Sequence, residues 1–303
     1  MITAELNTKV LGNHKVKVNG DDLSFRNVPE YQRTKHVHRL HPYLGKYIPQ
    51  LVSYFLIRYF KPGDIVLDPY LGSGTTLVEA QALGINSLGI EISEFNSLIS
   101  EVKVAKYNTH LLEKEVFDIL EKTKRFSKEI PPKNHIKFPI IESKILTTNS
   151  EYLKNWLSPR ALQEILYYRS QIPEYKYQDL LKIILSRATR SARLITHYDL
   201  ARPKKPVNVP YYCIKHRKTC EPVDEALKFI DRYSIDTVQR VKEYDRIRTD
   251  AKAKVIQGDS RIVKLPINLL GKIDGVFTSL LGSLLGDASL FNLGFDDKAH
   301  HYV

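Results

Sequence analysis

A glycine-rich turn between two apolar runs holds the residues whose types and spacing most directly suggest chemistry. In the stretch DIVLDPYLGSGTTLVEAQALGINSLGIE (64–91), the first run ends in Asp68, Gly72 and Gly74 follow, and the second run ends in Glu91. Glycine has no Cβ, so a ligand can approach the turn closely, and the free N–H groups of a following helix favour anionic ligand groups. An acid at the end of the second strand suits hydrogen bonds to ribose hydroxyls. These residues predict a ligand that contains a nucleoside.

Two phosphate-binding patterns do not fit this turn. No Gly-Lys-Ser/Thr follows, as a P-loop requires, and Leu77 stands where the pattern Gly-x-Gly-x-x-Gly has its third glycine. Asp68 also places a carboxylate where a dinucleotide site holds a pyrophosphate. A ligand with a positive amine and an adenosine therefore fits better than one with phosphates. An α/β protein without such a ligand can also contain a strand, turn and helix of this kind.

Helix and strand patterns alternate around the turn. The apolar spacing and the turn signals predict helices over 48–60 and 75–84, the latter closed by Gly84. Short buried strands are expected over 65–68 and 86–91. This alternation predicts an α/β fold.

A mostly helical stretch separates these elements from a second group of strands. One helix is expected to begin after Ser158 as N-cap, with Pro159 at its first position. In another helix, over 224–244, four apolar residues fall on one buried stripe, namely Leu227, Ile230, Val238 and Val241. Strand patterns return over 253–260 and 272–279.

The predicted organisation is one α/β domain interrupted by an insertion. Residues 1–105 hold a lead-in and the first part of the α/β domain, 106–250 form a helical, basic insertion, and 251–303 return to the α/β domain. No internal repeat and no low-complexity segment is found.

The turn resembles a motif of a known enzyme family. DPYLGSGTT (68–76) is similar to Asp-Pro-Phe/Tyr-x-Gly-Ser-Gly-Thr-Thr of the amino-group DNA methyltransferases, which bind S-adenosylmethionine. HPYLGKYIPQL (41–51) resembles the segment that covers the methionine end of the cofactor, and VIQGDS (255–260) resembles a strand end that meets the adenine amino group. The resemblance implies a Rossmann-like methyltransferase sheet with a mainly helical insertion. It also implies these cofactor-binding residues: Tyr43, Lys46, Asp68, Pro69, Gly72, Ser73, Gly74, Thr75, Thr76, Glu91, Asp259 and Ser260.

The expected catalytic loop departs from the family pattern. In the family, the catalytic strand ends in Ser/Asp/Asn-Pro-Pro-Tyr/Phe, and this loop holds a flipped-out base. Here Ser279 is in place, but Leu280 and Leu281 replace the prolines and Gly282 replaces the aromatic residue. Two leucines cannot impose the fixed φ of two prolines, and glycine has no stacking face. We therefore expect a truncated or inactivated member, with a sheet incomplete at the C-terminus; a gene interruption, a missing partner polypeptide and an engineered change all remain open as causes.

The resemblance leaves several functions open. Ser279, as the candidate catalytic residue, favours N4 of cytosine over N6 of adenine as the methylated position. The alternatives are a non-catalytic nucleic-acid-binding protein that keeps the cofactor pocket, and an RNA methyltransferase of related fold. Double-stranded DNA is the expected partner, and a cognate restriction endonuclease or a second polypeptide that completes the fold are further candidates.

Basic residues gather in the insertion, which we expect to recognise the target. The net charge of +12 favours a polyanionic partner such as nucleic acid. Arg187, Arg190 and Arg193 recur at three-residue spacing, which places them near one helix face, and Tyr198, Tyr211 and Tyr212 could stack on bases. Charge runs are often only solvated faces, so phosphate contact stays a hypothesis for these residues and for Arg202, Lys204, Lys205, Lys215, Arg217 and Lys218.

The segment YYCIKHRKTC raises a metal question. Cys213, His216 and Cys220 have the short spacing of zinc ligands, and His197 could complete a tetrahedral site. The alternative is two ordinary reduced cysteines beside a surface histidine, and because only three ligands are local we expect no metal.

Composition excludes a secreted disulfide scaffold and a membrane protein. Two cysteines in 303 residues give no disulfide framework and fit a reducing cytoplasm. The longest apolar stretch, 51–60, contains Arg58 and is too short to span a bilayer. The N-terminus also lacks the pattern of a signal peptide, so a cytoplasmic location without a membrane partner is expected.

Overall fold

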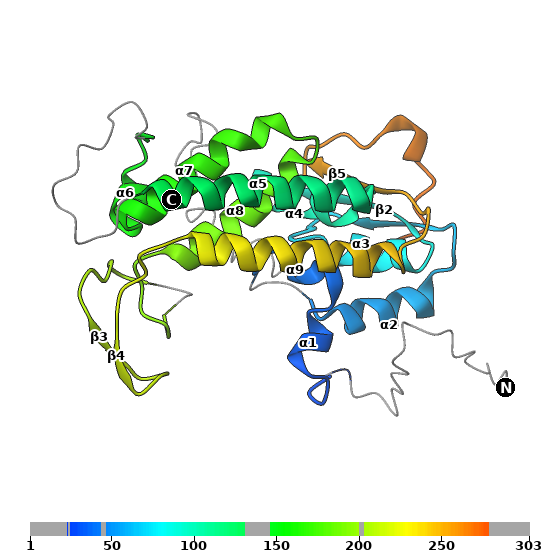
Figure 1. Ribbon diagram of the computed structural model, residues 1–303. Coiled ribbons are helices and arrows are strands. Elements are labelled where there is room, and N and C mark those ends of the chain that lie inside the picture. The colour runs from blue at the N-terminus through cyan, green and yellow to red at the C-terminus, as the bar shows by residue number, and fades with distance from the viewer. Residues whose placement is uncertain (1–22, 24, 44–46, 131–145, 200–202, 279–303) are drawn as a thin grey trace.

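A parallel sheet and a set of long helices make up the fold. The computed structural model describes residues 23, 25–43, 47–130, 146–199 and 203–278 (Figure 1). The strands are β1 (Ile65–Asp68), β2 (Asn86–Glu91), β3 (Tyr211–Cys213), β4 (Lys218–Cys220), β5 (Ala253–Gln257) and β6 (Gly275–Val276). The α-helices are α1 (Glu30–Arg33), α2 (Pro49–Tyr59), α3 (Thr75–Ala82), α4 (Glu94–Val104), α5 (Thr109–Glu129), α6 (Glu151–Trp156), α7 (Pro159–Gln171), α8 (Gln178–Ala192) and α9 (Leu227–Asp245). Short 3₁₀ turns are η1 (His36–Arg39), η3 (Ile172–Glu174) and η4 (Ile267–Leu269).

The main sheet has the strand order β5-β2-β1-β6, and all of its neighbours are parallel. Leu67 of β1 lies beside Leu88 of β2 on one side and Val276 of β6 on the other. The order therefore reverses at β1, since β2 and β5 extend the sheet to one side and β6 to the other. In open α/β sheets, ligands bind at such a reversal, outside the carboxyl ends of the strands.

The local sequence signals around the turn predict these elements correctly. The strands expected over 65–68 and 86–91 coincide with β1 and β2; β2 is buried from Ser87 to Glu91, and in β1 Val66 and Asp68 are buried. Gly84 follows the C-cap of α3 at a φ of +77°, a left-handed conformation that glycine adopts without strain. Ser158 caps α7, because its side chain accepts a hydrogen bond from the N–H of Ala161.

The insertion packs onto the α/β part through one continuous core. Helix α9 contacts both α5 and α8, and Figure 1 shows α5 and α9 running side by side. The predicted stripe on α9 is buried at Ile230, Val238 and Val241 and half-buried at Leu227. A single cluster of buried side chains reaches from these helices to α3 and α4. Among the described helices, none is both long and apolar enough to cross a bilayer.

A buried carboxylate fastens the N-terminal segment to α3. Glu79, which is 1% exposed, accepts hydrogen bonds from Lys35 (3.1 Å), His38 (2.7 Å) and Ser53. Burial alone would raise the pKa of Glu79, but the charge of Lys35 and the hydrogen bond from His38 outweigh it and hold that pKa well below its usual value. This network places residues 36–43, which lead to Tyr43, beside the glycine turn.

Candidate functional site

The glycine turn after β1 has a backbone that side chains would disturb. Gly72 and Gly74 have φ of +58° and +80°, in the left-handed region. A Cβ at Gly74 would lie 2.8 Å from Ser100 Oγ, and one at Gly72 would lie 3.3 Å from the ring of Tyr43. Because the glycines have no side chains, α4 can pack against the turn at Gly74 and Tyr43 can pack against it at Gly72.

Helix α4 stabilises the turn through two side-chain hydrogen bonds. Ser100 donates a hydrogen bond to the carbonyl of Gly72 (3.1 Å), and the ammonium of Lys103 donates to the carbonyl of Ser73 (2.5 Å). Both side chains are fully buried. Leu71 packs so closely on β2 that a Cβ at Gly89 would lie 2.5 Å from its side chain. These contacts fix the turn before any ligand arrives.

Glu91 lies beside the turn at the end of β2. Its carboxylate accepts hydrogen bonds from the N–H groups of Gly72 (2.7 Å) and Ser93 (2.9 Å). Burial raises the pKa of Glu91, and hydrogen bonds from Ser93 and Gly72 oppose that rise. Burial and the charge of Glu91 raise the pKa of Tyr43. A carboxylate and a phenol therefore flank the same glycine-rich loop.

Asp68 connects three elements at the point where the sheet order reverses. It accepts hydrogen bonds from Thr76 Oγ1 of α3 (2.6 Å), Thr278 Oγ1 after β6 (2.8 Å) and the N–H of Tyr70 (3.2 Å). Burial raises the pKa of Asp68, while these hydrogen bonds oppose the rise. Asp68 is 2% exposed, so in this structure it positions the turn, and its predicted direct contact with a ligand stays a prediction.

Two hydroxyls of the turn are buried without a partner. Among the described residues, nothing hydrogen-bonds to Ser73 Oγ or Thr75 Oγ1, although Ser73 is 2% and Thr75 4% exposed. No side chain caps the start of α3. Because buried polar groups normally find a partner, these atoms fit a polar ligand seated on the turn.

Asp259 and Ser260 follow β5, the strand next to β2. The N–H of Gly258 donates to the carbonyl of Glu91 (2.9 Å), which ties the two strand ends together. Arg261 binds the carboxylate of Asp259 through two nitrogens, at 3.0 and 2.5 Å, and lowers the pKa of Asp259 to about 2. The predicted contact between Asp259 and an adenine amino group stays a prediction.

Four residues that position this site were not predicted from the sequence. Tyr47 donates to the carbonyl of Thr278 (2.5 Å), immediately before Ser279, so it positions the end of β6. The other three are Ser100, Lys103 and Thr278. Only Lys103 left a signal in the sequence, as a lysine on the apolar face of α4. Two predicted residues, Lys46 and Ser279, lie outside the described residues.

Comparison with known proteins gives relatives of one kind. A DNA methylase family model, that of the N6/N4 methyltransferases, matches residues 8–101. The Type II methyltransferase M.MjaII of Methanocaldococcus jannaschii is 39% identical over 324 residues, which cover 85% of this chain and 61% of that protein. These matches support membership of the amino-group DNA methyltransferase family. The resemblance expected from residues 68–76 is thereby confirmed.

Two further relatives cover less of the chain. M.BsoBI of Geobacillus stearothermophilus is 35% identical over 102 residues, 31% of this chain and 20% of that protein. M.MvaI of Kocuria varians is 33% identical over 108 residues, 35% of this chain and 23% of that protein. Both are Type II methyltransferases. This chain spans less than two thirds of the length of each relative, and no solved structure shows a significant match.

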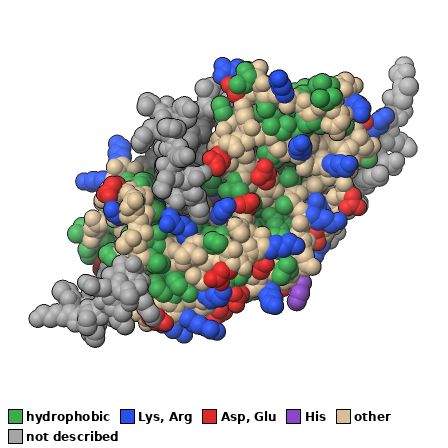
Figure 2. All heavy atoms as spheres, turned by 90° about the horizontal axis from the view of Figure 1, so that it is seen from above, with side chains coloured by type: hydrophobic (Ala, Val, Ile, Leu, Met, Phe, Trp, Pro, Cys, Tyr) green, Lys and Arg blue, Asp and Glu red, His purple; other side chains and the backbone are tan. Residues whose placement is uncertain are grey.

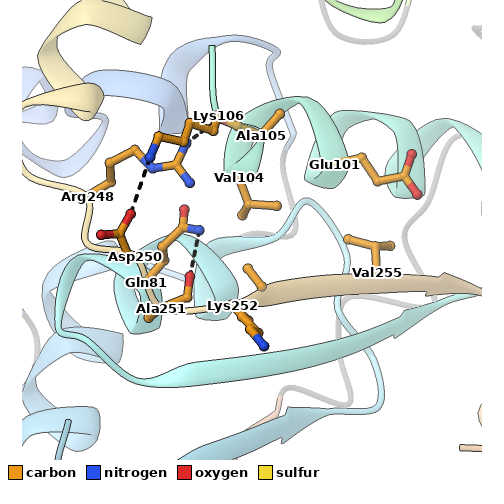
Figure 3. A pocket seen from close by; sticks show the side chains of 11 residues that line it. Gln81, Glu101, Val104, Ala105, Lys106, Arg248, Asp250, Ala251, Lys252 and Val255 are labelled. Atoms are coloured by element: carbon orange, nitrogen blue, oxygen red, sulfur yellow. Dashed lines mark hydrogen bonds and ion pairs between the residues drawn. The ribbon is translucent and has the colours of Figure 1, made fainter. Parts of the chain in front are cut away.

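A groove of about 450 Å³ lies away from the glycine turn. It opens where the chain leaves α4 for the insertion and returns to β5, toward the amino end of that strand (Figure 3). Arg248 donates to the carbonyl of Ala105 (2.7 Å), and Gln81 donates to that of Ala251 (3.0 Å). These bonds tie the segment that leads into the insertion and helix α3 to the segment that returns to β5. We therefore interpret the groove as the junction between the insertion and the α/β part.

The arginines predicted to line one face of α8 are largely buried, which argues against their predicted phosphate contact. Arg187 is 9% exposed, and it pairs with Asp236 of α9 (2.5 Å) and stacks on Tyr233, 4.0 Å from the ring centre. Arg193 is 1% exposed, and Arg190 is half-buried with a pKa lowered by burial and by Arg193. Arg193 lies just beyond the helix, because α8 ends at Ala192, and both Arg187 and Arg193 pack inside the insertion.

The remaining basic candidates are exposed around the β3–β4 hairpin. Lys204, Lys205, Lys215, Arg217 and Lys218 are exposed, while Arg202 lies outside the described residues. Figure 1 shows the hairpin projecting from one end of the insertion, far from the main sheet. On the face of Figure 2, by contrast, Lys and Arg are interspersed with Asp and Glu. The hairpin is therefore the better candidate for phosphate contact.

Proposed function

We propose that this chain binds S-adenosylmethionine at the glycine turn and acts in methyl transfer to an exocyclic amino group of DNA. The proposal depends on one arrangement. Glu91 lies against the backbone of Gly72, next to the unpartnered hydroxyls of Ser73 and Thr75. When bound, S-adenosylmethionine supplies an electrophilic methyl group; family membership and this geometry support it as the cofactor.

The residues of the turn have distinct roles in this proposal. Glu91 accepts hydrogen bonds from the ribose hydroxyls, and Ser73 and Thr75 meet polar groups of the ligand. Tyr43 covers the turn, since its ring lies against Gly72. Asp68 is a positioning residue, because it holds α3 and the end of β6 in register.

We assign target recognition to the insertion, residues 106–250, with the hairpin lysines and arginine on the DNA phosphates. The amino acceptor favoured is N4 of cytosine over N6 of adenine, because Ser279 matches the Ser-Pro-Pro-Tyr branch of the family at its first position. The next three residues, Leu280, Leu281 and Gly282, do not match. This departure favours a second candidate, a non-catalytic DNA-binding member that keeps the cofactor pocket.

Transfer of tritiated methyl groups to a DNA duplex and to RNA separates the candidates. The chain as it stands is expected to transfer slowly, because misplacing the base can cost about three orders of magnitude in rate. The variant L280P/L281P/G282Y restores the family loop and is expected to methylate DNA, and Ser279→Ala in that variant should abolish the reaction. Methylation of RNA alone would contradict the proposal, and no transfer by either chain would favour the non-catalytic member.

A further inference from the structure

Four metal-ligating side chains converge at the β3–β4 hairpin. Cys213 ends β3, His216 lies in the turn, Cys220 ends β4, and His197 follows α8 on a separate segment. The four donor atoms all lie within 4.8 Å of one another. Cys213 Sγ is 3.7 Å from His197 Nδ1 and 3.6 Å from His216 Nδ1, and Cys220 Sγ is 3.5 Å from His216 Nδ1.

These separations are those of a tetrahedral zinc site. With a Zn–S bond of about 2.3 Å and a Zn–N bond of about 2.05 Å, a tetrahedron has sulfur–nitrogen edges of about 3.6 Å. The three separations of 3.7, 3.6 and 3.5 Å match that edge to about 0.1 Å. Hydrogen bonds explain them less well, because His216 Nδ1 has either one N–H or one lone pair and would have to serve both thiols with it. We propose that His197, Cys213, His216 and Cys220 bind one structural Zn²⁺ ion.

The hairpin needs such a ligand for its stability. Each strand has three residues, and a two-stranded hairpin of this size is marginal in water. Within the described part of the chain, neither strand contributes a side chain to the two core clusters. Tyr212 and Ile214 are 64% and 68% exposed, while Cys213 and Cys220 are buried. The inward face of the hairpin therefore consists of the ligands and the half-buried Tyr211, which accepts a hydrogen bond from the N–H of His197, so metal binding would supply much of its folding free energy.

The zinc site would also arrange the basic side chains of the hairpin for phosphate contact. This consequence rests on the proposed function. Lys215, Arg217 and Lys218 alternate with the ligands along the same short segment and are exposed. Arg217 has a φ of +52°, so the turn holds a non-glycine residue in the left-handed region. Zinc would hold these cations in one arrangement for phosphate contact.

Metal analysis of the purified full chain tests the proposal. Inductively coupled plasma mass spectrometry is expected to find about one zinc ion per chain. The variants Cys213→Ser, Cys220→Ser and His216→Ala should each lose at least nine tenths of it, whereas His110→Ala, an exposed histidine on α5, should keep it. Replacement of zinc by Co²⁺ should give the intense visible bands of a tetrahedral, thiolate-bound ion.

Two outcomes would overturn the zinc site. One is less than a tenth of a zinc ion per chain, with no gain when Zn²⁺ is added to the reduced protein. The other is full zinc content in His216→Ala, which would place the ion elsewhere. If a cysteine variant fails to fold, titration of the unmodified chain with Co²⁺ still decides the question. None of these readouts needs cofactor or DNA, so they separate failure of the zinc site from failure of the proposed function.

Discussion

The substitution Gly74→Ala tests the construction of the glycine turn most sharply. Gly74 has a φ of +80°, and a new Cβ would lie 2.8, 3.0 and 3.1 Å from Ser100 Oγ, Cβ and Cα. The left-handed backbone costs alanine about 1–2 kcal/mol. Crowding in a packed interior adds about 1–3 kcal/mol, because the third contact is backbone and cannot rotate away. The free energy of unfolding should therefore fall by about 2–5 kcal/mol.

Gly63→Ala is the matched control. Gly63 has a φ of +96°, but a Cβ there would meet nothing within 4 Å, so only the backbone cost of about 1–2 kcal/mol applies. Urea denaturation, with unchanged m-values, gives both losses. Adding Ser100→Gly to Gly74→Ala removes the two nearest atoms and should recover part of the loss, a coupling of about 0.5–3 kcal/mol. Equal losses at positions 63 and 74, with no coupling to position 100, would refute the packing of α4 on the turn.

The remaining predictions concern acid stability and DNA binding. Burial lowers the pKa of His38 to about 4 and of His41 to about 3, so the unfolded chain binds more protons below pH ~6.5, and stability should fall as the pH drops from there toward these values. Denaturation between pH 6.5 and 5 should show that His41→Gln removes up to about 1.4 kcal/mol per pH unit of this slope. An unchanged slope in His41→Gln would contradict the buried neutral ring. Affinity for DNA should fall steeply with salt. Replacing Lys204, Lys205, Arg217 and Lys218 together by alanine should reduce the slope of log K against log salt by about 3 to 4. An unchanged slope would mean that the DNA surface lies elsewhere.

The parts of the fold that the sequence predicts are those set by short-range signals. The strands ending in Asp68 and Glu91 and the helix after Gly74 follow from apolar runs and glycine positions within one short stretch. The cap of α7 likewise needs only Ser158 and its neighbours. Residues whose role depends on distant partners were harder to predict. Thr278 meets Asp68 across more than two hundred residues, and no local pattern marks that pair.

The arginines of α8 show the same limit. Helical spacing predicts one face for Arg187, Arg190 and Arg193, but α8 ends at Ala192, before the third arginine. Spacing also cannot show whether a helix face meets water or another helix. The partners of Arg187 are Asp236 and Tyr233 on α9, an ion pair and an aromatic ring that make burial of a charge tolerable. In the zinc cluster, the fourth ligand, His197, is also separated from the other three, so only the fold brings the set together.

The most direct measurement is calorimetric titration of the intact chain with S-adenosylmethionine and S-adenosylhomocysteine. One ligand should bind per chain, and Glu91→Gln should weaken binding by about 10- to 100-fold, since a charge-assisted hydrogen bond contributes about 1.5–3 kcal/mol. Glu94→Gln, which changes an exposed carboxylate three residues away in the sequence, should bind like the unmodified chain. Absence of binding to the intact chain, or equal affinity in Glu91→Gln, would contradict the assignment of the glycine turn as the cofactor site.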